Sequence, residues 1–160
     1  MVTALSNGVS QAAQPILSTN YGAGRFDRIY KVRALGIKTA LAVCALPAVL
    51  GLLVPDLFTY IFLNPSSEVL ALSATAIRIY FIGFFVTGTN MFIINYFQAI
   101  VRPGISLALC LFRGCVFNLI LVSVLPLLLG VTGIWMAVPL TEFISMGAGV
   151  FLIKKISVKH

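Results

Sequence analysis

Charged residues are scarce in this sequence, and the side chains that carry most enzymatic chemistry are scarcer still. Only 9% of the 160 residues are charged, whereas about 25% are charged in soluble domains. The chain has four acidic residues and one histidine, His160, at its end. A zinc centre, a Ser/Cys–His nucleophile or a membrane-embedded active site needs several such groups converging on one point. We therefore expect neither an enzyme nor a bound cofactor.

Cysteine is also rare, and its positions form no metal-binding or disulfide pattern. Cys44, Cys110 and Cys115 all lie in apolar runs, with no CxxC motif among them. Cys110 and Cys115 are five positions apart and so do not share a helical face. We expect all three to be small buried hydrophobic residues.

Apolar residues make up 60% of the chain, and its mean hydropathy is +1.07. A chain of this composition belongs in a lipid bilayer, because it has too little polar surface to cover a soluble core. Since a spanning helix needs about 20 mostly apolar residues, the sequence predicts about five spans, over residues 2–23, 36–62, 69–100, 104–128 and 132–153. The runs do not alternate as strands of a β-barrel would. We expect an all-α, polytopic membrane helix bundle forming a single domain over residues 1–160.

Basic residues gather in the connections on one side of these spans. They occupy residues 24–35, residues 101–103 and the C-terminus, whereas Asp56 and Asn64 lie in a connection on the other side. The positive-inside rule places the basic connections and the C-terminus in the cytoplasm of a multi-pass protein of the cell (inner or plasma) membrane. Because the basic clusters flank apolar spans and form no groove with stacking aromatics, we expect no nucleic-acid binding.

The predicted topology puts Met1 on the outer side of the membrane. No basic lead-in or cleavable signal precedes the first span to carry it there. The simplest interpretation is that the chain is the tail of a longer protein whose earlier helices are missing.

Two predicted spans carry polar side chains at helical spacing, which is unusual in a membrane. In the first span these are Asn7, Ser10 or Gln11, Gln14 and Ser18, and in the third they are Tyr80, Asn90, Met91, Asn95 and Gln98. Such faces either line a cavity for flat, partly apolar organic molecules or form hydrogen bonds between packed helices. The residues leave both interpretations open. The candidate cavity residues are Gln11, Gln14, Tyr80, Asn90, Met91, Asn95 and Gln98.

Charged residues inside spans are costly and need an explanation. We expect Arg78 near the outer interface, where its side chain can reach water. Arg113 lies near the membrane centre if its helix begins at Pro103, and at the inner interface if the helix begins later. Glu142 is roughly central, and is either a proton or cation site or a static partner for Arg113 or a helix hydroxyl. The static interpretation is favoured.

An ordered series of short motifs resembles a known transporter family. Gly8, Gln14-Pro15 and Tyr21-Gly22-Ala23 before a basic loop are similar to the second helix of a lobe in multidrug and toxic compound extrusion (MATE) transporters. Further matches follow in order at residues 77–80, 97–100, 113, 130–135 and 139–142. The resemblance covers essentially the whole chain, which is similar to helices eight to twelve of the family, the C-terminal lobe without its first helix.

This resemblance implies a fold of two six-helix lobes around a central cavity, of which the chain is part of one. It implies a secondary active antiporter for multidrug (xenobiotic) efflux, which exports small organic cations and drugs in exchange for H⁺ or Na⁺ by alternating access. The implied partners are these drugs, the lipid bilayer and the missing N-terminal lobe, and no cofactor beyond the coupling ion is expected.

The chain also departs from the family pattern. Several members use an acidic residue in the tenth helix for coupling, but residues 80–100 contain no Asp or Glu. Coupling would then depend on the missing half, and we expect this fragment to be inactive alone because it lacks its pseudo-symmetric partner. The alternative is a fragment of a related flippase for lipid-linked oligosaccharides, in which Arg78 and Arg113 would bind phosphate.

Overall fold

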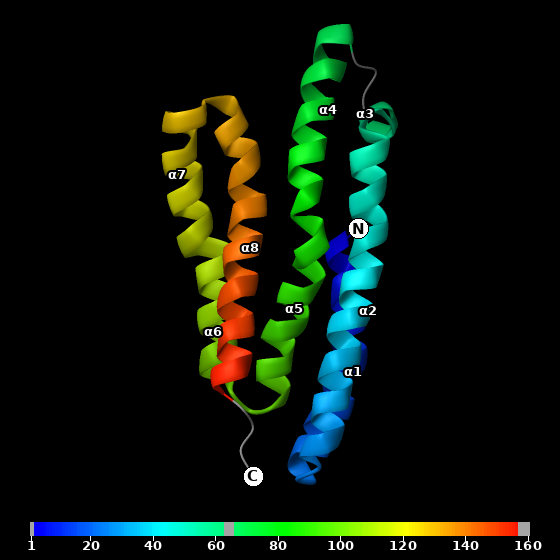
Figure 1. Cartoon of the computed structure of the whole chain (residues 1–160), viewed down its shortest axis with the longest axis vertical. Helices are drawn as coiled ribbons and strands as arrows, with labels where there is room; N and C mark the ends of the chain where they lie inside the picture. The colour runs from blue at the N-terminus through cyan, green and yellow to red at the C-terminus, as the bar shows by residue number, and fades with distance from the viewer. Residues whose placement is uncertain (1, 63–65, 157–160) are drawn as a thin grey trace.

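The chain folds into helices with no strands among the residues described, 2–62 and 66–156, in a computed structural model (Figure 1). The helices are α1 (Val2–Gly22), α2 (Phe26–Leu53), α3 (Pro55–Phe62), α4 (Ser67–Ile82), α5 (Phe84–Ala99), α6 (Pro103–Leu111), the short π-helix η1 (Phe112–Val116), α7 (Phe117–Leu129) and α8 (Val131–Lys155). The all-α prediction is confirmed. Asn64 and His160, on which the sequence analysis drew, lie outside the described residues.

Four helical stretches are long and apolar enough to cross a membrane, and they confirm a polytopic membrane bundle. They are Phe26–Leu53, Glu68–Ala99, Pro103–Leu129 and Val131–Lys155. α1 is not among them, because its amides and hydroxyls lower its hydropathy.

Helix boundaries differ from the predicted spans mainly around α2. Residues 24–35 were expected to form a connection, but α2 begins at Phe26 and carries the basic cluster on its first turns. The predicted span 36–62 is divided, since α2 ends at Leu53 and α3 begins at Pro55. Proline has no backbone N–H to donate and holds the preceding Val54 out of helical geometry (φ −131°, ψ 63°). Pro47, by contrast, lies inside α2 without ending it.

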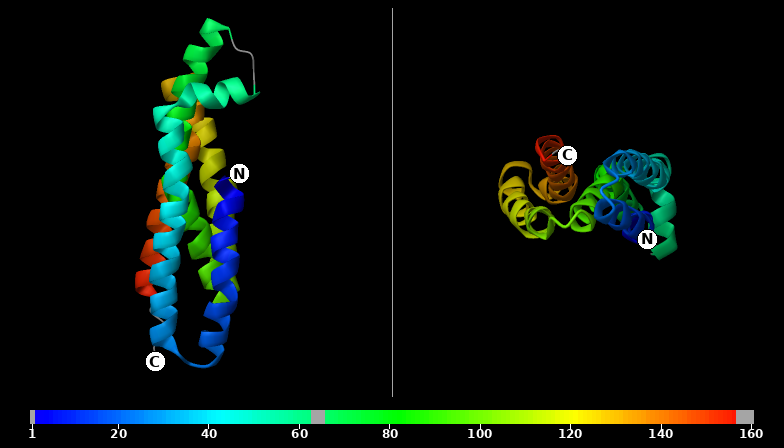
Figure 2. Two further views of the ribbon diagram at one scale, coloured as in Figure 1. Left: turned by 90° about the vertical axis from the view of Figure 1, so that its right-hand side faces the viewer. Right: turned by 90° about the horizontal axis from the view of Figure 1, so that it is seen from below.

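α5 lies at the centre of the bundle and contacts α1, α2, α6 and α8. Two views of the ribbon show α1 and α2 on one side of α5, and α6, α7 and α8 on the other (Figures 1 and 2). The largest buried side chains come from α5 itself and include Phe92, Tyr96 and Phe97, each no more than 1% exposed. α5 is therefore the element on which the two groups of helices pack.

Two glycines allow the helices around α5 to approach closely. A Cβ at Gly83, between α4 and α5, would lie 3.1 Å from the Cα of Pro139 in α8. A Cβ at Gly88 would lie 2.5 Å from the Sγ of Cys44 and 2.8 Å from the carbonyl oxygen of Ala40, both in α2. Small residues at such contacts are how membrane helices gain close packing when lipid supplies no hydrophobic drive between them.

The prediction that all three cysteines are buried is wrong for two of them. Cys44 is buried against α1 and α5, but Cys110 and Cys115 are exposed. In a membrane helix, apolar residues face lipid as well as the core, so an apolar run does not predict burial.

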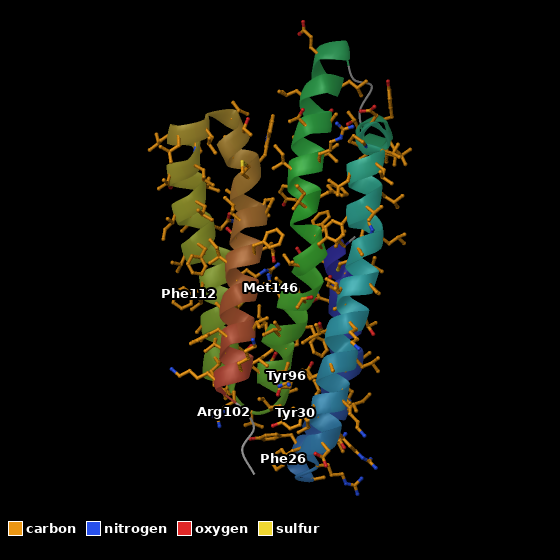
Figure 3. All side chains as sticks on the ribbon, viewed as in Figure 1. Phe26, Tyr30, Tyr96, Arg102, Phe112 and Met146 are labelled. Atoms are coloured by element: carbon orange, nitrogen blue, oxygen red, sulfur yellow. The ribbon has the colours of Figure 1, made fainter. Side chains whose placement is uncertain are left out.

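The basic residues gather at one end of the bundle, which we call the basic end. The turn between α1 and α2, the connection between α5 and α6, and the end of α8 all lie there (Figure 1). Tyr30, Tyr96 and Arg102 lie toward this end (Figure 3). The guanidinium of Arg33 sits 5.0 Å and 5.7 Å from the ring centroids of Tyr30 and Tyr96. This stacking holds a partly buried cation within the helix packing.

Candidate functional site: a buried polar cluster and an amide face

A polar cluster joins α5, η1 and α8 inside the bundle. The Arg113 Nη2 atom lies 2.6 Å from Oε1 of Glu142, and Nε of Arg113 donates to both carboxylate oxygens at 3.0 and 3.1 Å. The side chains are 20% and 8% exposed. Two parallel N–H···O bonds give the strongest geometry available to an arginine and a carboxylate. The Arg113–Glu142 contact is the static pairing favoured from the sequence.

Asn90 and Met91 of α5 complete this cluster. The Nδ2 atom of Asn90 donates to Oε2 of Glu142 at 2.6 Å and to the backbone carbonyl of Glu142 at 2.8 Å. The Nη1 atom of Arg113 lies 3.3 Å from the sulfur of Met91, a weak acceptor. Asn90 is 3% exposed, so its amide is committed to α8 and does not face an open cavity. We call Asn90, Met91, Arg113 and Glu142 the polar cluster.

The backbone around Arg113 is a π-helix, which positions the guanidinium. η1 interrupts an otherwise continuous helix running from α6 into α7. A π-turn adds residues to one turn and shifts the faces of the helix on either side, and such turns occur often at functional sites. Because α6 begins at Pro103, Arg113 lies about 15 Å along the helix at 1.5 Å per residue. This depth is near the middle of a bilayer.

α5 has a second, less buried face that carries amides. Met91, Ile94 and Asn95 are half-buried and Gln98 is exposed, at the spacing of one helical face. Asn95 donates to the carbonyl of Met91 within its own helix at 2.8 Å. Tyr80 does not continue this face, because α4 ends before Gly83 and the Tyr80 ring packs edge-on against Phe84, with centroids 5.7 Å apart.

α1 packs through one face and leaves its amides on another. Ser6 and Ser10 are buried, and the Ser6 Oγ atom lies 3.1 Å from Sγ of Cys44 in α2. Gln11 is exposed and Gln14 half-buried. A stripe of small residues at i and i+4 was the available signal for the packing face, and the sequence analysis did not use it for Ser6.

The amides of α1 lie on the flank of that helix nearest α5. A groove between α1 and α2 is lined on the α1 side by Gly8, Ala12 and Ile16. At about 100° per residue, Gln11 and Gln14 point to the opposite flank. Among the described helices α1 contacts only α2 and α5, so its amides border α5. We call the surface formed by Gln11, Gln14, Asn95 and Gln98 the amide face.

No group of three metal-ligating side chains occurs among the residues described. The polar cluster is neutral as a pair, with one guanidinium and one carboxylate. The arrangement can hold helices in register and present amide donors and acceptors to a polar or aromatic molecule.

Known transporters share this arrangement of helices. The MatE family model matches residues 1–124. The chain is similar to the MATE multidrug transporter DinF-BH, solved in complex with rhodamine 6G, with 30% identity and a TM-score of 0.89 over 97% of this chain and 34% of that one. Among curated proteins, none matches the chain significantly.

Two further solved structures share the fold at lower identity. An outward-facing multidrug resistance MATE family transporter of the MOP superfamily matches with 20% identity and a TM-score of 0.86, over 96% of this chain and 35% of that chain. An inward-facing one matches with 19% identity and a TM-score of 0.76, over 92% and 36%. The chain thus spans about a third of the length of the transporters it matches. It belongs to the MatE family of multidrug transporters.

Proposed function

We propose that this chain forms most of the C-terminal lobe of a secondary active multidrug efflux antiporter. In this proposal the complete transporter exports small organic cations and drugs in exchange for H⁺ or Na⁺, by alternating access between two lobes. Membership of the MatE family supports a transport role, and the complex of the similar DinF-BH with rhodamine 6G supports a drug as the substrate.

The observation that carries the proposal is the amide face. Gln11 and Gln98 are exposed and Gln14 and Asn95 half-buried, in a bundle whose other exposed side chains are largely apolar. Unpaired amide groups facing hydrocarbon are disfavoured. An amide-bearing surface is therefore expected to face a second lobe across a polar cavity, where it can contact a flat organic substrate.

The polar cluster has a different role in this proposal. Arg113 neutralises Glu142, and Asn90 occupies a further lone pair of the carboxylate. A carboxylate held in this way is a helix-joining element, so we place the coupling-ion site in the missing lobe. The basic end is assigned to the cytoplasm by the positive-inside rule, which puts the C-terminus inside a cell (inner or plasma) membrane.

The flippase alternative relied on Arg78 and Arg113 as phosphate ligands. Both hydrogen-bonding edges of the Arg113 guanidinium are already directed at Glu142 and Met91. No observation favours this alternative, and we do not retain it.

A split-transporter assay tests the proposal. Cells without other drug pumps would express the chain alone, or together with the preceding helices of DinF-BH, and rhodamine 6G accumulation would be measured with and without an ion gradient. We expect gradient-dependent efflux only with both parts. Asn95→Ala and Gln98→Ala should reduce efflux, whereas the exposed apolar control Leu119→Ala should not. Efflux by the chain alone, or full efflux by both amide variants, would refute the proposal.

A further inference from the structure

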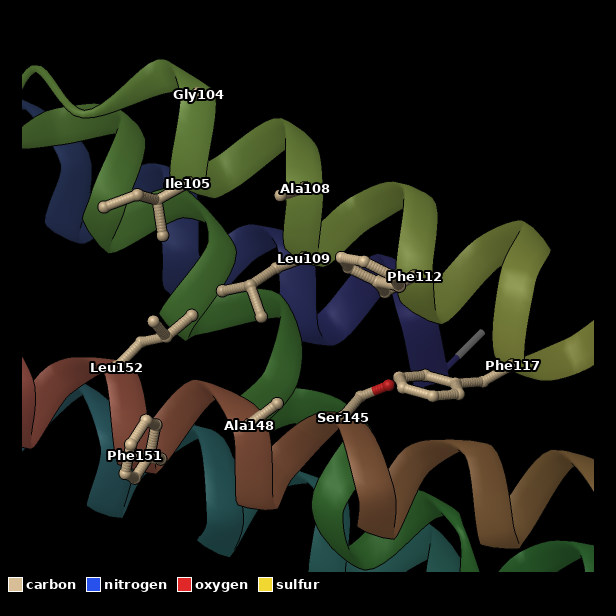
Figure 4. A pocket seen from close by; sticks show the side chains of 10 residues that line it. All are labelled: Gly104, Ile105, Ala108, Leu109, Phe112, Phe117, Ser145, Ala148, Phe151 and Leu152. Atoms are coloured by element: carbon tan, nitrogen blue, oxygen red, sulfur yellow. The ribbon is translucent and has the colours of Figure 1, made fainter.

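An apolar groove runs between α6 and α8, apart from the polar cluster and the amide face (Figure 4). Its volume is about 450 Å³. One wall is formed by Ile105, Leu109 and Phe112, and the other by Ala148, Phe151 and Leu152. No residue of α5 lines the groove, although α5 packs against both α6 and α8. The groove therefore opens on the flank that α5 leaves uncovered.

The groove lies within two membrane-crossing helices, and its length matches one leaflet. At 1.5 Å per residue, the wall from Gly104 to Phe112 extends about 12 Å, close to half of the roughly 30 Å hydrocarbon core. The rings of Phe112 and Phe117, with centroids 5.7 Å apart, lie at the end nearer the membrane centre (Figure 4). The other end, at Gly104 and Leu152, opens toward the basic end.

Three cations surround that open end. Arg102 immediately precedes α6, and Lys154 and Lys155 are the last residues of α8. The Nζ atom of Lys155 lies 5.9 Å from the ring centroid of Phe151, which lines the groove. All three cations are exposed, and none is paired with an acidic side chain in the part of the chain that the structure describes.

We propose that this groove binds an acyl chain of an anionic phospholipid, whose phosphate lies among Arg102, Lys154 and Lys155. Basic pockets between membrane helices at the lipid surface recognise anionic headgroups, and the apolar walls suit a hydrocarbon chain. An organic cation is disfavoured by the three positive charges, so this site is distinct from a drug site. The inference depends on the chain spanning a membrane and not on the proposed transport activity.

The dimensions favour a lipid chain over a packed helix. A volume of 450 Å³ along about 12 Å gives a cross-section on the order of 37 Å². A helix 10–12 Å across occupies roughly 80–110 Å². The groove is thus too narrow to seat a whole helix within it.

Native mass spectrometry of the purified chain tests the headgroup part. Dioleoyl phosphatidylglycerol would be compared with dioleoyl phosphatidylcholine, which has the same acyl chains. Each basic side chain near an anionic surface contributes about a five-fold factor, so Lys154→Gln with Lys155→Gln should lower the preference for phosphatidylglycerol by up to about 25-fold. The matched pair Arg25→Gln with Lys31→Gln removes the same charge elsewhere at the basic end and should leave the preference unchanged. Equal retention of both lipids, or equal losses in the two pairs, would overturn the proposal.

Photocrosslinking tests the acyl part. Phosphatidylglycerol with a diazirine in its acyl chain should label α6 and α8, and Ala108→Trp should reduce this labelling at least five-fold. Ala12→Trp, in the groove between α1 and α2, is the control and should leave it unchanged. Labelling spread over all helices refutes the site, as does capture of a helix of the other lobe by a cysteine at position 108 in the two-part transporter. If Ala108→Trp fails to fold, labelling of the parent chain still decides.

Discussion

The polar cluster makes a quantitative prediction about stability, because its partners come from three different helices. Removing one partner of a buried ion pair leaves the other charge unpaired and costs about 3–5 kcal/mol. Since Arg113 is 20% exposed, we expect the lower value, about 3 kcal/mol, for Glu142→Leu and for Arg113→Met taken singly. Glu142→Gln should cost less, because its amide oxygen can still accept from Asn90 or Arg113.

The double variant separates pairing from packing. With Arg113→Met and Glu142→Leu together, no charge is left buried, and apolar replacements of similar volume are often neutral or stabilising. The double variant should therefore be within about 1 kcal/mol of the parent, giving a coupling energy of several kcal/mol in a double-mutant cycle. Unfolding by SDS, followed by the helical circular dichroism signal, provides the free energies, with the exposed Leu119→Ala as the control.

Additive losses in the double variant would refute this reasoning. They would mean that Arg113 and Glu142 each contribute through separate contacts. Losses under about 0.5 kcal/mol in both single variants would likewise show that the pair is solvated, as surface ion pairs are.

Two further predictions concern packing and sidedness. Gly88→Ala should destabilise the chain by about 1–3 kcal/mol in the same unfolding assay, because the new methyl group would meet Cys44 at 2.5 Å, whereas Gly104→Ala, with nothing within 4 Å, should change little. With the native cysteines replaced by alanine, Ala23→Cys and Val131→Cys should react with an impermeant maleimide from opposite sides of the membrane, and labelling from the same side would contradict the topology.

The apolar architecture could be predicted from the sequence because lipid imposes simple rules. Backbone groups in hydrocarbon must bond within a helix, so long apolar runs predicted helices correctly. The same rules do not position a helix end. Pro55 ends α2 whereas Pro47 does not, and the difference depends on whether neighbouring helices hold the chain straight, which the sequence of one segment does not encode.

The polar cluster was only partly predictable, for a related reason. Arg113 and Glu142 are each costly in a membrane, so a pairing between them could be anticipated from charge alone. The participation of Asn90 depends on the register between α5 and α8, and that of Met91 on the π-turn that reorients Arg113. Neither register nor a π-turn leaves a periodic signal in the sequence.

The two faces of α5 explain how one helix can serve both stability and transport. Its buried side is tied to α8 through Asn90 and to η1 through Met91, so the neighbouring amides Asn95 and Gln98 are carried on a helix that cannot rotate without breaking those bonds. In the proposed transporter, such a surface would keep its shape while the lobes rock against each other, which is the usual form of alternating access. The chain shares its fold with both outward-facing and inward-facing relatives, as expected for a lobe that moves as one body. Loosening the cluster should therefore impair transport even where the amide face is untouched, and Asn90→Leu is the variant in which that dependence can be measured.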